Sequence, residues 1–171
     1  MTDLAALQVE RRLVAVSALG SLRDGTNSRL DRVLGMLCEF FRLPLATVVV
    51  ATREKMYMKA SWGLDVSTTN LTGSFTEAVK KAECTVVIPD ASRDERFATS
   101  PFVTSAPHLR AYIARPERAG GTIVGALAMG GPEPREFTDH EQERFRAVAG
   151  WIEEELAAEA DLAAAVRRTA A

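Results

Sequence analysis

The chain has 171 residues and a formal net charge of −2; 47% of its residues are hydrophobic and 26% are charged. This length and composition predict one soluble globular domain and exclude a disordered chain. The weak negative charge excludes a general attraction to nucleic acid or to an anionic membrane, and no apolar run approaches the roughly 20 residues that span a bilayer. We therefore predict a cytoplasmic protein with no nucleic-acid partner and no membrane partner.

Two amphipathic helices are predicted at the start of the chain. Apolar residues recur at spacings of three and four across residues 4–22, and again across residues 30–41. The polar turn at residues 24–27 separates the two apolar stripes, and Pro44 helps to end the second helix. Each stripe indicates a helix that packs one face on a hydrophobic core.

Short extended segments follow these helices. Runs of apolar and β-branched residues bounded by turn residues are typical of strands, and they predict strands at residues 47–52, 56–62, 85–88, 109–115 and 122–129. A short polar turn joins the first two strands and a Gly-Gly pair joins the last two, so two hairpins are expected. The order of hairpins and helices favours an α+β domain with a mainly antiparallel sheet.

Two capping boxes mark the starts of later helices. Ser74 and Glu77 have the spacing in which each side chain bonds the other's backbone N–H, which predicts a short helix that ends near Ala82. Thr138 and Glu141 repeat the pattern at the start of a long apolar stripe. A helix from there to residue 166 would be about 42 Å long at 1.5 Å per residue, so its end is expected to project beyond the sheet.

Residues 90–107 are predicted to form a long irregular connection. This segment contains Pro101, Pro107 and many small polar residues, with a helical turn expected near residues 92–97. Long loops in compact domains are often functional. The region around this loop is therefore the first place to look for a binding site.

Several segments around this loop carry a family resemblance. They are VIPDASRDERF at 87–97, SPFVT at 100–104, PHLRAY at 107–112, GALAM at 125–129 and PREFT at 134–138. Together they resemble a bacterial branch of the GAF superfamily, of the type found with sensor kinases and diguanylate cyclases. The resemblance covers roughly residues 10–157. It departs from the branch at residues 114–117 and at Ala128, where a cysteine is common in the branch.

The resemblance implies the architecture of the whole chain. It implies a six-stranded, mainly antiparallel sheet with the N- and C-terminal helices on one face. The loop and a short helix would form a layer on the other face, with a ligand cavity beneath the loop. One GAF-like domain would then occupy residues 1–171, with its core at about 10–157 and a helical extension or frayed tail at 158–171. Dimerisation is frequent in such domains.

Five residues are candidates for contacts to a ligand. His108 and Tyr112 have the same parity in an extended chain, so they are expected to face one cavity together with Phe97 and Phe102. Aromatic walls with one or two polar tips are typical of a small-molecule pocket, although an ordinary core with polar groups at its edge has the same composition. Asp90 is a further ligand candidate, with loop capping as its alternative role.

The terminal helices offer a second functional surface. Leu13 and Val16 on the first helix, with Ile152 and Leu156 on the last, are candidates for a helical seam that relays a signal between two copies of the chain. Packing on the chain's own sheet explains part of this stripe. A homodimer is therefore expected, with a further signalling protein as a candidate partner.

No catalytic residue and no metal ligand is predicted. The two histidines and the two cysteines, Cys38 and Cys84, show no ligand spacing for zinc. The sequence has no G-x-S-x-G motif and no recognisable Cys/His signature of a nucleophile. Both cysteines are expected to be buried structural residues, because each lies in or beside an apolar run.

The preferred hypothesis is a non-catalytic domain that senses a small molecule and relays the event through its terminal helices. The residues name neither the ligand nor a cofactor. One alternative is a module that holds no ligand and serves dimerisation or protein interaction. A second is a GAF-type reductase of free methionine sulfoxide, which would require Cys38 or Cys84 to react.

Overall fold

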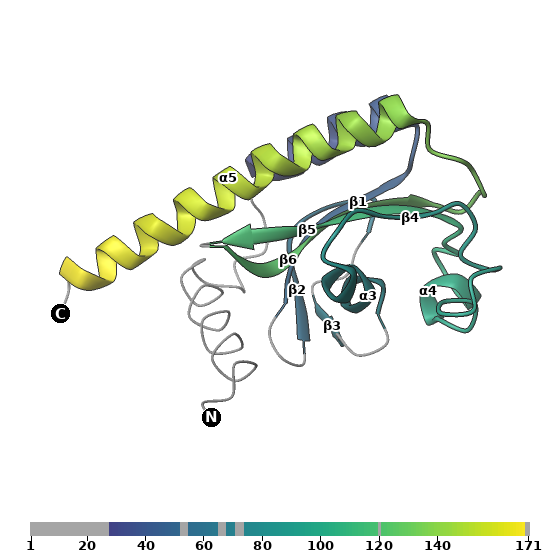
Figure 1. The fold of residues 1–171 in the computed structure, drawn as a ribbon, viewed down its shortest axis with the longest axis horizontal. Coiled ribbons are helices and arrows are strands. Elements are labelled where there is room, and N and C mark those ends of the chain that lie inside the picture. Colours follow the sequence, from purple (N-terminus) through teal and green to yellow (C-terminus); the bar gives the residue numbers. More distant parts are fainter. Residues whose placement is uncertain (1–27, 52–54, 65–67, 71–73, 120, 170–171) are drawn as a thin grey trace.

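The computed structural model describes residues 28–51, 55–64, 68–70, 74–119 and 121–169. In this part of the chain, a six-stranded antiparallel sheet carries helices on both faces (Figure 1). The α+β class and the antiparallel sheet are therefore confirmed. The helix predicted at residues 4–22, with Leu13 and Val16, lies outside the described residues.

The sheet is built from two hairpins that meet through their inner strands. Across the sheet the order is β3 (Thr68–Asn70), β2 (Lys55–Trp62), β1 (Leu45–Ala51), β6 (Thr122–Gly131), β5 (Ala111–Ala119) and β4 (Val86–Ile88). Both predicted hairpins, β1–β2 and β5–β6, are present. The three-residue strand β3 was not predicted, because its sequence Thr-Thr-Asn has no apolar alternation.

Strand β5 differs from its prediction at both ends. It begins at Ala111 rather than at residue 109, and it continues through Pro116 to Ala119. Pro116 lies opposite Ala126 on β6, and the register shifts between Glu117 and Arg118. Proline is confined to sheet edges or bulges because it lacks a backbone N–H, and here the irregularity follows directly after it.

Helices α2 (Ser28–Phe41) and α5 (Asp139–Thr169) lie side by side on one face of the sheet (Figure 1). The core beneath them contains Leu34 and Phe41 of α2 and Phe145 of α5, each exposed by 1% or less. The rings of Phe41 and Phe145 meet edge to face at 6.3 Å. The apolar stripes predicted for these two helices therefore face the core, except at Phe40 of the α2 stripe, which is 57% exposed.

Helix α5 begins at the predicted capping box. The Oγ1 atom of Thr138 accepts a hydrogen bond from the N–H of Glu141 at 3.2 Å, and a Glu141 carboxylate oxygen accepts one from the N–H of Thr138 at 2.9 Å. The helix has 31 residues, which corresponds to about 46 Å. Its C-terminal part extends past the sheet in Figure 1, as predicted.

The opposite face of the sheet carries α3 (Phe75–Ala82), α4 (Pro101–Thr104) and the loop between β4 and β5. The N–H of Glu77 donates to Oγ of Ser74 at 3.1 Å, so the predicted N-cap of α3 is present. In the loop, the N–H groups of Phe97 and Ala98 both donate to the carbonyl of Asp94. Helix α4 begins separately at Pro101 and was not predicted.

Candidate ligand cavity

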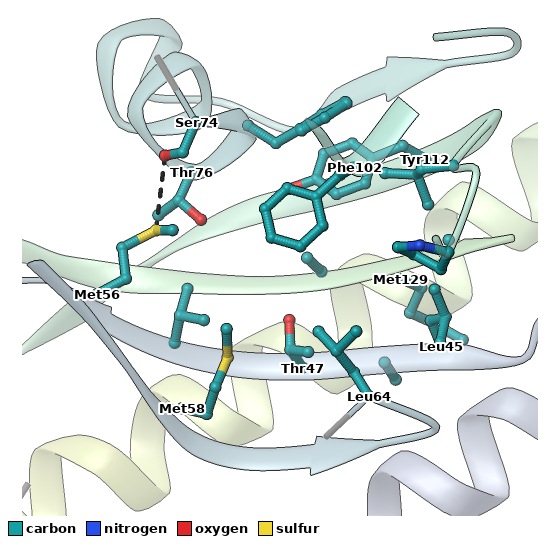
Figure 2. Close-up of a pocket in the computed structure, with 17 residues that line it drawn as sticks. Leu45, Thr47, Met56, Met58, Leu64, Ser74, Thr76, Phe102, Tyr112 and Met129 are labelled. Atoms are coloured by element: carbon teal, nitrogen blue, oxygen red, sulfur yellow. Dashed lines mark hydrogen bonds between the residues drawn. The ribbon is translucent and has the colours of Figure 1, made fainter. Parts of the chain in front are cut away.

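A cavity of about 80 Å³ lies between the sheet and the layer formed by α3, α4 and the loop (Figure 2). Strands β1, β2 and β6 form its floor, and α3 and the loop form its roof. The lining residues are Leu45, Ala46, Thr47, Val49, Met56, Met58, Leu64, Ser74, Phe75, Thr76, Phe102, Pro107, Leu109, Tyr112, Ala128, Met129 and Gly130.

The two-residue period of the strands decides which side chains reach this floor. On β1, Thr47 and Val49 line the cavity, whereas Val48 and Val50 belong to the core beneath the helices. On β2, Met56 and Met58 have the same spacing and both line the cavity. Successive side chains of a strand point to opposite faces of the sheet, so this spacing could have identified the floor once the buried faces were known.

Aromatic rings form much of the roof. The ring of Phe75 stacks on Phe97 at 4.1 Å and meets Tyr112 at 4.7 Å. Of the three predicted aromatic contacts, Phe102 and Tyr112 line the cavity. Phe97 is buried behind Phe75 and supports the wall from outside. Figure 2 shows the rings of Phe102 and Tyr112 next to each other above Thr47.

Tyr112 brings a polar group to this apolar wall. Burial raises the pKa of its hydroxyl well above the usual value, so the hydroxyl is protonated across the physiological range. Among the described residues it has no hydrogen-bond partner. The hydroxyl is therefore a free donor and acceptor at the cavity.

His108 is not among the described residues that line the cavity. Its parity with Tyr112 assumed an extended chain, and that assumption was wrong, because His108 has a φ of 56° and β5 begins only at Ala111. Its backbone N–H donates to the carbonyl of Ser105 at 2.7 Å. Leu109, one residue further on, lines the cavity instead.

Asp90 also lies outside the lining. Its carboxylate accepts hydrogen bonds from Oγ of Ser92 at 2.6 Å and from the N–H of Ser92 at 3.0 Å. These bonds, the side-chain bond foremost, hold the pKa of Asp90 below its usual value. Asp94 and Arg96 form an ion pair at 2.6 Å in the same loop. The contacts of Asp90 therefore match its alternative role, which is loop capping.

The two cysteines occupy different environments. Cys38 of α2 is buried in the core between the helices and the sheet, and burial raises the pKa of its thiol to about 11. Cys84 is exposed, so its predicted burial was wrong. It follows Glu83, which ends α3 in the left-handed conformation and turns the chain outward. Neither cysteine lines the cavity.

Strand β5 connects the cavity side of the sheet to α5. Nη1 of Arg115 donates to the carbonyl of Arg146 on α5 at 3.1 Å, and its guanidinium lies 4.0 Å from the carboxylate of Glu153. Lys59 of β2 pairs with Glu159 of α5 at 2.5 Å. These contacts join the sheet to α5 at two strands.

The predicted relay residues Ile152 and Leu156 are buried within the chain itself, with exposed fractions of 0% and 1%. Packing on the sheet accounts for both, so they present no side-chain area to a partner. Further along α5, Leu162 and Val166 are 67% and 57% exposed. The exposed apolar surface of α5 therefore lies about two to three turns beyond Leu156.

One buried residue escaped the sequence analysis. Glu117 on β5 has an exposed fraction of 0%, and neither of its carboxylate oxygens has a hydrogen-bond partner. Its two-residue spacing from Ile113 and Arg115 places it on the helical face of the sheet. Strand parity could have predicted the burial of Glu117, but the predicted strand ended at residue 115 and did not include it.

Within the described ranges, no group of three or more His, Cys, Asp or Glu side chains is arranged to hold a metal ion. No helix in these ranges combines the length and the apolar character that a membrane crossing requires.

The sheet, its helical face and the cavity beneath a loop on its other face define a GAF-like α+β fold. The family model described as "GAF domain" matches residues 26–156, and the chain belongs to this family. A curated relative is a cyclic di-GMP phosphodiesterase of Pseudomonas aeruginosa, 29% identical over 125 residues. That match covers 72% of this chain but only 21% of the relative.

Solved structures show the same fold at low sequence identity. The GAF domain of a phosphoenolpyruvate-protein phosphotransferase from Coxiella burnetii has a TM-score of 0.65 and 18% identity, with coverage of 97% of this chain and 99% of that one. The free methionine-R-sulfoxide reductase of Neisseria meningitidis, solved with its substrate, has a TM-score of 0.63 and 20% identity, with 95% coverage of both chains. These likenesses show the fold alone.

Proposed function

We propose that this chain is a non-catalytic sensory domain that binds a small molecule in the cavity and transmits the event through α5. The observation that carries this proposal is the position of two residues on β5. Tyr112 lines the cavity on one face of the sheet, and Arg115, three residues on, bonds the backbone of α5 on the other. A ligand that moves β5 therefore acts on α5 directly.

A relay of this kind requires two states with different ligand affinities. Besides the apolar core beneath α5, polar contacts from Arg115 and Lys59 link the sheet to this helix. Nη1 of Arg115 donates one hydrogen bond to α5 at 3.1 Å, and Nη2 of the same side chain lies 4.0 Å from a carboxylate oxygen of Glu153. Such contacts can be exchanged at low cost, because an exposed ion pair contributes only about 0–1 kcal/mol.

The first experiment is mass spectrometry of gently purified protein under native and then denaturing conditions. The sensor proposal predicts extra mass that is lost on denaturation. Phe102→Trp, which enlarges a side chain at the cavity, is expected to abolish this mass. Phe40→Trp is the matched control, because Phe40 is 57% exposed on α2. Protein that carries no ligand and accepts none would contradict sensing.

We further propose that the output runs through a homodimer formed by the end of α5. Leu162 and Val166 lie near the C-terminal end of α5, and both are exposed. A second copy of the same helix would cover them as in a helical seam. A signalling protein is a second proposed recipient, since the curated relative is nearly five times longer than the matched segment.

Light scattering after size exclusion tests the dimer. Changing both Leu162 and Val166 to Glu is expected to produce monomer at concentrations where the unchanged chain is dimeric. Met36→Glu is the control, because Met36 is an exposed apolar residue of α2 with an exposed fraction of 62%. Loss of the dimer in the Met36 variant alone would place the interface on α2 and refute the α5 seam.

The small cavity volume favours one alternative. Pockets for drug-sized ligands measure roughly 300–1,000 Å³, whereas this cavity has about 80 Å³. A GAF domain that only dimerises would have such a small cavity. A ligand-free dimer whose state does not respond to added small molecules would support this alternative over sensing.

A further inference from the structure

We propose that the cavity selects a small uncharged molecule that is apolar over most of its surface and hydrogen-bonds the hydroxyl of Tyr112. This inference rests on the proposed sensory function, because it names the ligand class for the same cavity. It is carried by three properties of the described lining: its lack of charge, the free hydroxyl of Tyr112 beside aromatic rings, and its size.

The lining offers no counter-charge to an ion. Its polar side chains are the hydroxyls of Thr47, Ser74, Thr76 and Tyr112, and none of its described residues is charged at neutral pH. An ionised ligand would lose its hydration without gaining a partner, which is costly in an apolar site. The charged groups of the nearby loop, such as Asp94 and Arg96, are already paired with each other.

No positively charged side chain lines the described cavity, and the N-terminus of α3 does not form a strong anion site either. Ser74 and Thr76 border the cavity there, but Oγ of Ser74 already accepts the N–H of Glu77. The carbonyl of Ser74 accepts the N–H of Ala78. The bond to Glu77 occupies one of the orphan donors of the first turn, so fewer of these donors can face a carboxylate.

Tyr112 supplies the polar contact that orients a ligand. Among the described side chains, only the carboxylate oxygens of Glu117 are both sealed from solvent and without a partner. The Tyr112 hydroxyl has no partner in the described part of the chain either, so it still reaches open space. Tyr112 lines the cavity, and a ligand oxygen or nitrogen there would satisfy it.

The walls suit a compact apolar body. Phe75, Phe102 and Tyr112 present aromatic surface, and Met56 and Met58 present thioethers. Methionine side chains are flexible and polarisable, so they adapt to small ligands of irregular shape. A volume of about 80 Å³ admits a molecule of a few non-hydrogen atoms, and Figure 2 shows Phe102 as the side chain above the centre of the floor.

The test uses small probes of five non-hydrogen atoms each: butan-1-ol, propionate, butylammonium and cyclopentane. The protein is labelled with ¹³C at its methionine methyl groups, and each probe is titrated at pH 7. Met56 and Met58 report the cavity, while Met36 is an exposed control on α2. Butan-1-ol is expected to shift the two cavity methyls saturably, and propionate and butylammonium are expected to leave them unchanged.

Tyr112→Phe then isolates the hydrogen bond. Loss of one such bond corresponds to roughly a fivefold weaker affinity for butan-1-ol, with little change for cyclopentane. Thr47→Val removes a different hydroxyl of the lining and is the second variant, in case Tyr112→Phe does not fold. It is expected to weaken the binding of butan-1-ol less than Tyr112→Phe does, because the proposal assigns the ligand's hydrogen bond to Tyr112.

The outcomes separate this inference from the sensory proposal. Saturable shifts with propionate or butylammonium, and none with butan-1-ol, would overturn the ligand class while leaving the cavity a binding site. Equal weakening of butan-1-ol and cyclopentane by Tyr112→Phe would overturn the role of the hydroxyl. If no probe shifts the methyl signals of Met56 and Met58, the proposed ligand class is overturned. The native mass measurement then decides the sensory function separately.

Discussion

The carboxyl group of Glu117 is buried on the face of the sheet that α5 covers, and the negative charge of Glu153 on α5 acts on it there. Burial is the larger effect, and Glu153 adds to it; together they raise the pKa of Glu117 to about 9. The positive charge of Arg115 opposes this shift only in part. Glu117 is therefore protonated at neutral pH, which explains how a carboxyl group is retained in this core.

The raised pKa of Glu117 predicts a loss of stability with rising pH. The group has a pKa near 4.5 when unfolded and about 9 when folded, so the folded state binds the proton more tightly. Its contribution is complete below pH 4.5 and is lost as pH rises towards 9, at about 1.4 kcal/mol per pH unit. Urea unfolding between pH 5 and 8.5 measures this slope.

Glu117→Gln supplies the control for that slope. The amide has nearly the same shape but does not titrate, so the free energy of unfolding of the variant should vary less over the same pH range. The groups with lowered pKa values, such as Asp94 and Glu141, titrate in acid and do not contribute there. Parallel curves for the two proteins would show that Glu117 is not the protonated group.

Arg115 is predicted to hold α5 to β5. Arg115→Lys keeps the positive charge but removes the fork that reaches both the Arg146 carbonyl and Glu153. We expect a loss of about 1 kcal/mol of unfolding free energy and faster hydrogen exchange in the first half of α5. Arg29→Lys is the matched control, because Arg29 pairs with Glu155 of α5 from an exposed position; similar effects in both variants would argue against a special role for Arg115.

Substitution by alanine is predicted to have opposite effects on stability at two glycines. A Cβ at Gly125 of β6 would lie 1.7 Å from the carbonyl oxygen of Val49, so Gly125→Ala must displace β1 and is expected to cost several kcal/mol. A Cβ at Gly150 of α5 would meet nothing within 4 Å. Gly150→Ala should therefore stabilise the helix by up to about 1 kcal/mol. Thermal unfolding of both variants measures the difference, and a tolerated Gly125→Ala would contradict the close strand contact.

We predict that the thiols of the two cysteines differ sharply in reactivity and that the chain has no reductase activity. Cys84 is exposed, whereas Cys38 is buried with a pKa of about 11. A thiol reagent at pH 8 should modify Cys84 rapidly and Cys38 only on unfolding, because the thiolate is the reactive form. Reduction of free methionine sulfoxide by the unchanged chain, lost in the variant with both Cys38→Ser and Cys84→Ser, would establish the reductase alternative and refute a non-catalytic domain.

Local signals in the sequence determined the class of fold and most of its elements. The N-cap at Ser74, the capping box at Thr138, the two hairpins and most of the apolar stripes of α2 and α5 were predicted correctly. Each depends on bonds between residues a few positions apart, or on a period of 3.6 or two residues. The resemblance to the GAF family rested on the same kind of contiguous segment, and the match over residues 26–156 confirms it.

Only the tertiary structure decided the composition of the cavity. Thr47 and Met58 belong to strands whose buried faces become known only when the sheet pairs and the layers pack. The left-handed conformation of His108 removed it from the position that strand parity predicted. Burial of Glu117 beneath α5 and exposure of Cys84 likewise depend on which distant segments cover them. Local periodicity carries no information about such coverage, because it arises from contacts between residues far apart in the chain.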